Sequence, residues 1–553
     1  MKKYILAICI LGTLCSSCEN NQEKIRNVED WTQYVEPRIG TAHCRWFHFT
    51  PGALPFGLAK PAPSTNGSLG NKWGWEATGY DYRENTIEGF PCLHEFQVGG
   101  IVLMPTSGKL VTVPGLPTDS VKTGYRSHFS RENEIATAGY YSVLLDDYQI
   151  QAELTATPRV AFQRFTFPKG TDNHILFNIG NRQGESGAVK DAYVTYTADG
   201  HIEGWVITMP EYVKKYQPGA TVPLYFSAVL DRKPESYGSF HGNTQLADAK
   251  ESKGTGAGMY FTFSNEQQEA VTAKIGLSYT SVENARINLQ AEAEGKTFED
   301  AKEQAHQIWQ EYLGRIEVET SKKEDKVKFY TGLYHALLGR GLANDVNGAY
   351  PRNDGSVGQL PMKEGKPQYN VYNTDAAWGA QWNLSQLWTL AYPEYMSEYV
   401  SSHIQAYKDA GWLADGLANN RYVSGVGTNL LSTIIAGAYQ CGIRDFDTKL
   451  AYEACLKNEL DGKDRPFGAG KVNTAEFVKY GYVPHQDQGE GYHETFMFSA
   501  SHTLEYSYSA WAVAQWAKSL GDTENYDKLM NLSKGWERLY DTSCNFILSL
   551  IHI

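Results

Sequence analysis

The sequence is poor in positive charge. Its 553 residues include 50 Lys and Arg against 63 Asp and Glu, which gives a formal net charge of −13. Nucleic-acid binding needs a basic stripe that displaces counterions, so this balance argues against that class of partner. The apolar run at the N-terminus, residues 4–14, has eleven residues, fewer than the ~20 that a helix needs to cross a bilayer. With 42% hydrophobic residues, the chain is predicted to be globular and not a multi-span membrane protein.

Several catalytic motifs are also absent. The sequence contains no G-x-S-x-G, no G-x-G-x-x-G after a strand and no G-x-x-x-x-G-K-[ST]. Neither His-Glu pair, at 94–95 and 493–494, has a second histidine three residues after the glutamate, which excludes the zinc-protease helix. Beyond the N-terminal segment, the cysteines at 44, 92, 441, 455 and 544 form no C-x-x-C pair. Neither a disulfide framework nor a zinc cluster is therefore predicted.

The N-terminus indicates export. Lys2 and Lys3 precede the apolar run 4–14, which ends before Cys15-Ser16-Ser17-Cys18 and a polar stretch. So short an apolar run is typical of a signal peptide, and a cysteine after two small residues resembles a bacterial lipoprotein cleavage box. We predict a lipoprotein-type signal peptide at 1–18, lipidation of Cys18 and a polar tether at 19–30. The predicted location is the outer membrane, held by acyl chains; the alternative is a soluble secreted or periplasmic protein.

Two kinds of periodicity divide the rest of the chain. Between about residues 31 and 280, short segments rich in β-branched and aromatic residues alternate with Gly, Pro, Asn and Asp, which predicts a large antiparallel β-sandwich. From Phe298 onward, apolar residues recur at helical spacing. Helices are expected at 327–342, 376–391, 394–410, 428–441, 445–459, 500–520 and 524–540. We assign 31–285 to the sandwich, 286–325 to linker helices and 326–553 to an all-α domain.

A block rich in Gly, Pro and aromatic residues runs from residue 39 to residue 110. It holds tryptophan, histidine and carboxylates, including Trp75, His94 and Glu95, in segments poorly suited to strands. Tyrosine and tryptophan combine a flat apolar face with a hydrogen-bonding tip, so such loops suit a rigid, aromatic-walled sugar site. The alternative is that Trp73 and Trp75 fill the core of the sandwich. The residue types leave both interpretations open.

The same block carries a family resemblance. Its order is Ile39-Gly40, Pro-Gly-Ala-Leu-Pro-Phe-Gly at 51–57, Gly74-Trp75, Gly-Tyr-Asp-Tyr at 79–82, Ile-Glu-Gly-Phe at 87–90, His94 and Leu-Met-Pro-Thr at 103–106. This order resembles the N-terminal signature of glycoside hydrolase family 92, and residues 278–289, 309, 329–335 and 503–506 resemble later parts of the same family. The resemblance implies a β-sandwich packed on an (α/α)6 toroid, and the activity of a calcium-dependent, inverting exo-α-mannosidase.

Two departures from the family pattern bear on the site. Where the family has Trp-Asp-Thr-x-Arg, this chain has Trp-Gly-Ala-Gln-Trp at 378–382, and Asp375 lies about one helical turn earlier. Asp375 either reaches toward the sugar or stays solvated at the helix N-terminus, where the dipole favours it. The family's Leu-Glu-Tyr-Ala-Tyr-Asp-Asp-Trp appears at 504–511 as Leu-Glu-Tyr-Ser-Tyr-Ser-Ala-Trp, which keeps Glu505 but neither aspartate.

The resemblance implies a set of substrate-binding residues: Trp75, His94, Glu95, Asp375, Trp378 and Glu505. Glu505 either contacts sugar or only supports helix packing. Calcium is the implied cofactor, with the catalytic acid, the catalytic base and most calcium ligands expected beyond residue 553. The loop 485–494 is rich in oxygen and imidazole groups, but metal ligands within this chain stay unassigned. Because the ending 547–553 is apolar and uncapped, we expect a partial toroid and an inactive fragment.

The predicted function is an exo-acting, inverting α-mannosidase that trims mannose from α-mannosides or N-glycans at a membrane surface. A second hypothesis is a carbohydrate-binding surface lipoprotein without hydrolytic activity, because aromatic rims and a lipid anchor also suit glycan capture. The expected partners are thus a glycan and, through the anchor, a membrane, with no nucleic acid.

Overall fold

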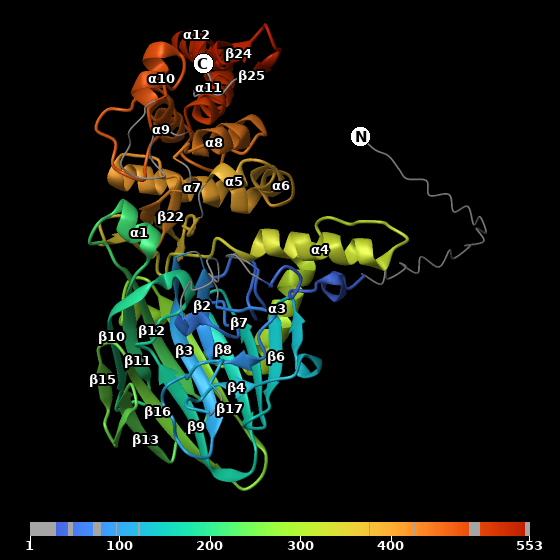
Figure 1. Ribbon diagram of the computed structural model, residues 1–553, viewed down its shortest axis with the longest axis vertical. Helices are drawn as coiled ribbons and strands as arrows, with labels where there is room; N and C mark the ends of the chain where they lie inside the picture. The colour runs from blue at the N-terminus through green and yellow to red at the C-terminus, as the bar shows by residue number, and fades with distance from the viewer. Residues whose placement is uncertain are drawn as a thin grey trace, which may run out of the picture.

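The computed structural model describes residues 29–42, 48–69, 79–95, 97–119, 122–374, 377–424, 427–485 and 498–547. Figure 1 shows two bodies stacked end to end, with the sheets of the N-terminal half at one end and the later helices at the other. Cys18, Trp75, Asp375 and the loop 486–494 lie outside the described residues. Within the described ranges, none of the helices combines the length and the apolar content that a membrane span requires.

Two antiparallel sheets form the N-terminal domain, which confirms the predicted sandwich. In the described part, the order of the larger sheet is β15-β10-β11-β12-β17-β8-β7-β6-β5, and that of the smaller is β14-β13-β16-β9-β3-β2. The larger sheet consists of β5 (Ile135–Thr137), β6 (Tyr140–Leu145), β7 (Ile150–Ala156), β8 (Val160–Phe167), β10 (Ala188–Tyr196), β11 (Ile202–Met209), β12 (Val222–Leu230), β15 (Glu251–Lys253) and β17 (Glu269–Ser278). The smaller consists of β2 (Phe90–Glu95), β3 (Val98–Ser107), β9 (Gly170–Asn178), β13 (Ser236–His241), β14 (Thr244–Ala247) and β16 (Ala257–Asn265).

Burial along the strands explains where a site can form. Strand β11 alternates buried and partly exposed residues along its whole length, as expected for a strand with one face on the core. Strand β2 lies at the edge of its sheet, yet all six of its residues are buried. The preceding loop covers that edge, because the N–H groups of Lys60 and Ala62 donate to the carbonyls of Cys92 and Pro91. The end of β2, with His94 and Glu95, is thus enclosed.

Helices follow the sandwich. Helices α2 (Val282–Ala293) and α3 (Phe298–Leu313) lie against it, and α3 packs on β6, β7 and β8. Helix α3 begins with a reciprocal capping box between Thr297 and Asp300 and buries the face that the helical spacing predicted. The helical domain contains α4 (Lys323–Leu338), α5 (Ala377–Ala380), α6 (Leu384–Ala391), α7 (Pro393–Ala410), α8 (Leu431–Gln440), α9 (Thr448–Leu460), α10 (Thr474–Tyr480), α11 (Ser499–Leu520) and α12 (Thr523–Leu532).

The helix predictions needed three corrections. The segment predicted at 376–391 is two helices, because Asn383 leaves the helical backbone conformation (φ −154°) between α5 and α6. The segment predicted at 524–540 ends at Leu532, and Gly535–Arg538 forms a separate short 3-10 turn. Helix α10 was not predicted, because seven residues ending in a left-handed Gly481 give little periodicity.

One loop of the sandwich inserts into the helical domain. Phe56 has a positive φ of 52°; its N–H donates to the carbonyl of Leu337, and its carbonyl accepts from the N–H of Leu342. Its ring stacks on Tyr395 with the ring centroids 3.4 Å apart. The rings of Tyr312, Tyr372 and Trp388 also lie around it. This part of the Gly- and Pro-rich block therefore fixes one domain to the other.

Candidate functional site

Glu95 joins the two domains. Its carboxylate accepts from the N–H of Gly341 at 2.5 Å and from the side-chain amide of Asn373 at 3.3 Å, both on the segment between α4 and α5. The Lys60 ammonium lies 3.8 Å from the same carboxylate and also donates to the carbonyl of Gly57. Burial lowers the pKa of Lys60, and the negative charge of Glu95 opposes that shift. Both carboxylate oxygens are thus engaged within the protein.

His94 lies beside this ion pair but has different partners. The side-chain amide of Gln183 lies 3.0 Å from Nε2 of the ring, and Phe49 packs 5.3 Å away between ring centroids. Burial lowers the pKa of His94 to about 3, so the imidazole is neutral at physiological pH. A neutral imidazole that accepts a hydrogen bond at Nε2 carries its proton on Nδ1.

Gln183 also reaches the two ends of the segment that contains Trp75. A Cβ built on Gly67 would meet the Gln183 amide at 2.3 Å, and one built on Gly79 would meet it at 2.6 Å. Gly67 and Gly79, on either side of the segment 70–78, therefore both lie next to Gln183, which is the hydrogen-bond partner of His94. The role of Trp75 itself stays a prediction, since that residue lies outside the described ranges.

Trp378 lies on α5, at the side of the helical domain that Asn373 approaches. Its ring meets Trp382 edge-on with the centroids 5.4 Å apart, and Trp382 is 64% exposed. The N–H of Ala377 donates to the buried Asp415, which also accepts from the Ser424 hydroxyl. The carboxylate of Asp415 fixes the start of α5. The result is a partly exposed pair of tryptophans on a fixed support.

Glu505 lies on α11 and is half-buried. Burial raises the pKa of its carboxyl group, and the positive charge of Lys471 opposes the shift. Lys471 is itself buried; it pairs with Glu459 at 2.5 Å and donates to the Ser509 hydroxyl at 2.7 Å. Glu505 is therefore a second carboxylate near a cation that already has a partner.

The described contacts bring only some of the predicted residues together. Asn373, which binds Glu95, also accepts from the N–H of Asn419, and its neighbour Thr374 bridges to Leu417, two residues after Asp415. These contacts run from Glu95 in one domain to Ala377 in the other, and His94 and Trp378 adjoin them as the chain neighbours of those two residues. No hydrogen bond or ion pair within the described part joins Glu505 to any of them.

Two family models match this arrangement of domains. The glycosyl hydrolase family 92 N-terminal domain matches residues 34–278, and the glycosyl hydrolase family 92 catalytic domain matches residues 284–549. The chain belongs to glycosyl hydrolase family 92. The first match ends with β17, at residue 278, and the second begins within α2, at residue 284, where the structure passes from sheets to helices.

Similar proteins agree with this fold. An "uncharacterized secreted glycosidase" of Arthroderma benhamiae is 25% identical over 546 residues, which is 92% of this chain and 62% of the relative. A family 92 α-mannosidase of Bacteroides thetaiotaomicron, solved with mannoimidazole, superposes with a TM-score of 0.82 at 24% identity over 94% of this chain and 65% of its own. A family 92 inverting mannosidase of the same species gives 0.81 at 22% identity, over 95% and 67%. This chain thus spans less than two thirds of the first two proteins.

Sequence reasoning missed several residues that contact or support the candidate site residues. Lys60, Gln183, Asn373, Asp415 and Lys471 belong to none of the motifs. Each is buried or lies against a buried partner from a distant part of the chain. The available signal was a lysine, Lys60, inside an otherwise apolar and Pro-rich stretch. A buried cation of this kind needs a carboxylate nearby.

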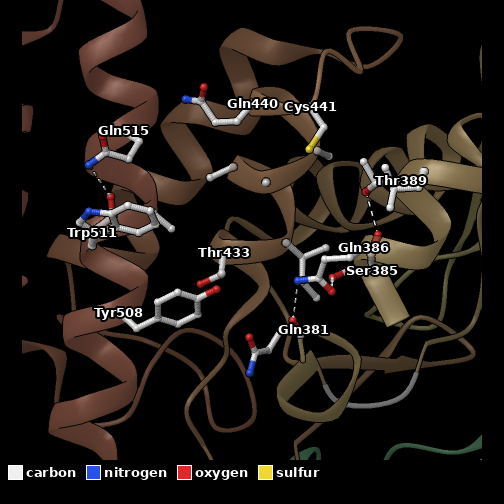
Figure 2. Close-up of a pocket in the computed structure, with 16 residues that line it drawn as sticks. Gln381, Ser385, Gln386, Thr389, Thr433, Gln440, Cys441, Tyr508, Trp511 and Gln515 are labelled. Atoms are coloured by element: carbon white, nitrogen blue, oxygen red, sulfur yellow. Dashed lines mark hydrogen bonds between the residues drawn. The ribbon is translucent and has the colours of Figure 1, made fainter. Parts of the chain in front are cut away.

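One hollow of the helical domain is a different feature. A cavity of about 310 Å³ lies between α6, α8 and α11, and Figure 2 shows Tyr508 and Trp511 facing Thr433 and Gln386 across it. Its lining is mostly apolar and contains no carboxylate or imidazole. It therefore lacks the acid and base groups that glycoside hydrolysis needs.

The described side chains offer no evident binding site for the implied calcium ion. Among the described residues, no group of three or more His, Cys, Asp and Glu side chains is arranged to hold a metal ion. Calcium takes six to eight oxygen ligands in general, and the described carboxylates at the junction are already engaged with Lys60, Gly341 and Ala377. The described part of the chain does not fit the ion.

Proposed function

We propose that this protein is an exo-acting, inverting α-mannosidase that removes mannose from α-mannosides or N-glycans. The observation that carries the proposal is the succession of both family 92 domain models on one chain. Two similar structures, an α-mannosidase and an inverting mannosidase, support the choice of sugar and of stereochemistry.

The predicted substrate-binding residues take distinct roles in this proposal. Trp378, together with Trp382, which was not in the predicted set, offers aromatic faces to a sugar ring, a common way to bind carbohydrate because the ring C–H groups are apolar. His94 supplies a neutral imidazole, and Glu505 a carboxyl group that holds its proton more tightly because it is half-buried. Glu95 acts indirectly, because its carboxylate holds the sandwich to the helical domain. Trp75 and Asp375 complete the set.

Inversion needs two carboxyl groups. One protonates the leaving oxygen and the other activates water, at a separation of roughly 6.5–9.5 Å. We assign neither role to a described residue. The requirement for calcium is part of the proposal and follows from family membership alone.

The test is mannose release by the protein expressed from its complete reading frame. Proton NMR during hydrolysis of an α-mannoside should show β-mannose as the first product, and chelation with EDTA should stop release until calcium is restored. Trp382→Ala should lower kcat/KM by about tenfold, or about 1.4 kcal/mol, without changing the melting temperature. The matched control is Trp536→Ala, at a tryptophan that is also exposed. First-formed α-mannose would overturn the inverting mechanism.

A second function rests on the departure at 378–382. Glycine and tryptophan stand where the family pattern has an acidic and a basic residue, and the exposed Trp382 remains as a sugar platform. The second candidate is therefore a glycan-binding surface lipoprotein without hydrolysis. Calorimetric binding of mannose oligosaccharides by the same preparation, with no mannose released, would favour it over the mannosidase.

The proposed location is the outer membrane, through a lipid on Cys18 after cleavage of the chain just before that residue. Cys18→Ala should move the protein from the membrane fraction to the soluble fraction, because acyl chains would be the anchor. An unchanged distribution of the variant would contradict lipidation at this residue.

A further inference from the structure

A short hairpin of the helical domain lies beside Asn373, because the N–H of its residue Asn419 donates to the Asn373 side chain. Its strands are β22 (Gly416–Ala418) and β23 (Arg421–Val423), and its two turn residues, Asn419 and Asn420, have φ values of 50° and 57°. Two successive positive φ angles are the mark of a type I′ turn, and asparagine tolerates them well. The turn places the side chains of Asn419 and Arg421 on one cavity.

The hairpin is fixed from both domains. The Asn420 side chain donates to the carbonyl of Pro351 at 2.8 Å, and that of Asn353 donates to the carbonyl of Asn420 at 3.1 Å. Gln217, which follows helix α1 (Glu211–Tyr216) of the sandwich, accepts from the N–H of Tyr422 at 3.0 Å and donates to Asn353 at 2.9 Å. Groups held this way lose little freedom when a ligand binds.

The cavity has a volume of about 210 Å³ and lies between the two domains. The sandwich contributes Tyr225 of β12 and Tyr279, and the helical domain contributes Arg352, Asn419 and Arg421. This size suits one sugar ring. The lining combines two aromatic faces with amide, hydroxyl and guanidinium groups, which are the groups that bind sugars.

Two of these polar groups have hydrogen-bonding capacity that the described residues leave unused. Asn419 is 2% exposed, and the oxygen Oδ1 of its side chain accepts no hydrogen bond in the described part of the chain. Arg421 is partly buried and donates to the carbonyl of Asn353, but it forms no ion pair with any described residue. Burial lowers the pKa of Arg421, and the negative charge of Asp354 opposes this shift only in part, so the guanidinium stays poorly solvated. A guanidinium keeps its proton in proteins, so this charge calls for an anion.

The nearby carboxylates are already engaged. Asp354 accepts from both the N–H and the hydroxyl of Ser356. Asp409 lies 3.7 Å from Arg352 and accepts from the Tyr350 hydroxyl. Asp345 accepts from Thr280 and Asn288. No ion pair joins Arg421 to any of these carboxylates in the described part of the chain, although the negative charge of Asp354 acts to raise the Arg421 pKa.

We propose that this cavity binds a monosaccharide that carries a carboxylate or a phosphate group. Arg421 binds the anionic group, and Asn419 and the Tyr225 hydroxyl bind the sugar hydroxyls. The site involves no reaction and none of the residues assigned to mannoside binding. It can therefore be tested independently of the proposed hydrolase activity.

Titration calorimetry on the full chain tests the proposal, with glucuronate, glucose 6-phosphate, glucose and inorganic phosphate as probes. We expect at least one sugar anion to bind with a Kd of about 1 mM or tighter. The comparison of the two anions tells carboxylate from phosphate. Glucose and inorganic phosphate should each bind about tenfold more weakly, because each lacks one half of the recognition. Equal binding of glucose would overturn the role of charge, equal binding of inorganic phosphate the role of the sugar, and no binding of either sugar anion the site itself.

Variants locate the binding. Arg421→Gln should weaken binding of the sugar anion by about tenfold. Asn419→Gly keeps the positive φ of the turn but removes the amide, and should weaken it by about threefold. The matched control is Arg232→Gln, at an arginine of the sandwich paired with Glu269, which should bind as the wild type does. If Arg421→Gln does not fold, Asn419→Gly decides, and unchanged binding in that variant contradicts the assignment.

Discussion

Helix α6 separates two aromatic surfaces that differ in almost every respect. Trp388 of α6 is fully buried in the junction cluster around Phe56, together with Tyr395 and Tyr399. Leu390, two residues later, is 82% exposed and lines the cavity between α6, α8 and α11. Tyr508 and Trp511 of that cavity are 43% and 48% exposed. The aromatic content of a segment thus does not predict whether its side chains are buried. Such side chains stabilise the fold only where another helix or loop packs against them.

The largest effect should follow from breaking the junction. Phe56→Ala removes a ring enclosed by aromatic side chains of the helical domain, and the free energy of unfolding should fall by about 3–5 kcal/mol, the usual cost for buried phenylalanine. Urea unfolding measures the loss. The matched control is Phe546→Ala, where the ring is 69% exposed and the change should stay within about 0.5 kcal/mol. Equal losses in the two variants would show that Phe56 does not anchor the junction.

Acid should weaken the junction next. Burial lowers the pKa of both His94 and His403 to about 3, against an ordinary value of 6.5. The unfolded chain then binds more protons below pH 6.5, so the stability from each neutral imidazole is present above that pH and is lost as the pH falls. Between pH 7 and pH 5 each imidazole accounts for a loss of about 2 kcal/mol in the free energy of unfolding.

His403 allows a clean test of this pH dependence. It lies on α7 next to Tyr399, and in the described part of the chain neither ring nitrogen has a hydrogen-bond partner. His403→Phe should therefore keep the stability at pH 7 and remove about 2 kcal/mol of the loss at pH 5. The control is the exposed His128→Gln. A pH dependence identical in His403→Phe and the wild type would exclude the imidazole as its source.

The smallest effect on stability should come from a substitution at the exposed cavity between α6, α8 and α11. Leu390→Ser changes a side chain that is 82% exposed, so the free energy of unfolding should change by no more than about 0.5 kcal/mol. Self-association in sedimentation velocity should decrease, because an apolar surface patch is lost. A loss of more than about 2 kcal/mol would mean that Leu390 is buried like Trp388 and would remove the contrast between the two surfaces.

The sequence predicted what local periodicity determines. The apolar spacing of Phe298, Ala301, Ala305 and Trp309 predicted the buried face of α3, and the alternating segments predicted strands such as β8 and β12. The family signature singled out His94 and Glu95. It did not predict that the Glu95 carboxylate meets Gly341 and Asn373, 246 and 278 positions away. Such contacts depend on how the two folded domains pack against each other, and local sequence patterns do not predict this packing.

The features that the sequence did not predict also have a physical explanation. The apolar spacing of 376–391 continues through the break at Asn383, so hydrophobicity alone joins α5 to α6. The pair of Lys471 and Glu459 combines residues from a loop and from α9, and each looks like an ordinary surface charge in the sequence. Buried ion pairs become visible only when both partners are placed.

The insertion of Phe56 has a consequence for the order in which the chain is made. Domains begin to fold during synthesis, N-terminal first, and the sandwich has all its strands once Ser278 has emerged. Phe56 belongs to that first domain, but Leu337, Trp388 and Tyr395 follow much later. A sandwich that folds first therefore carries an exposed phenylalanine until α4 to α7 have been made. During this interval Phe56 is an apolar side chain that a chaperone can bind.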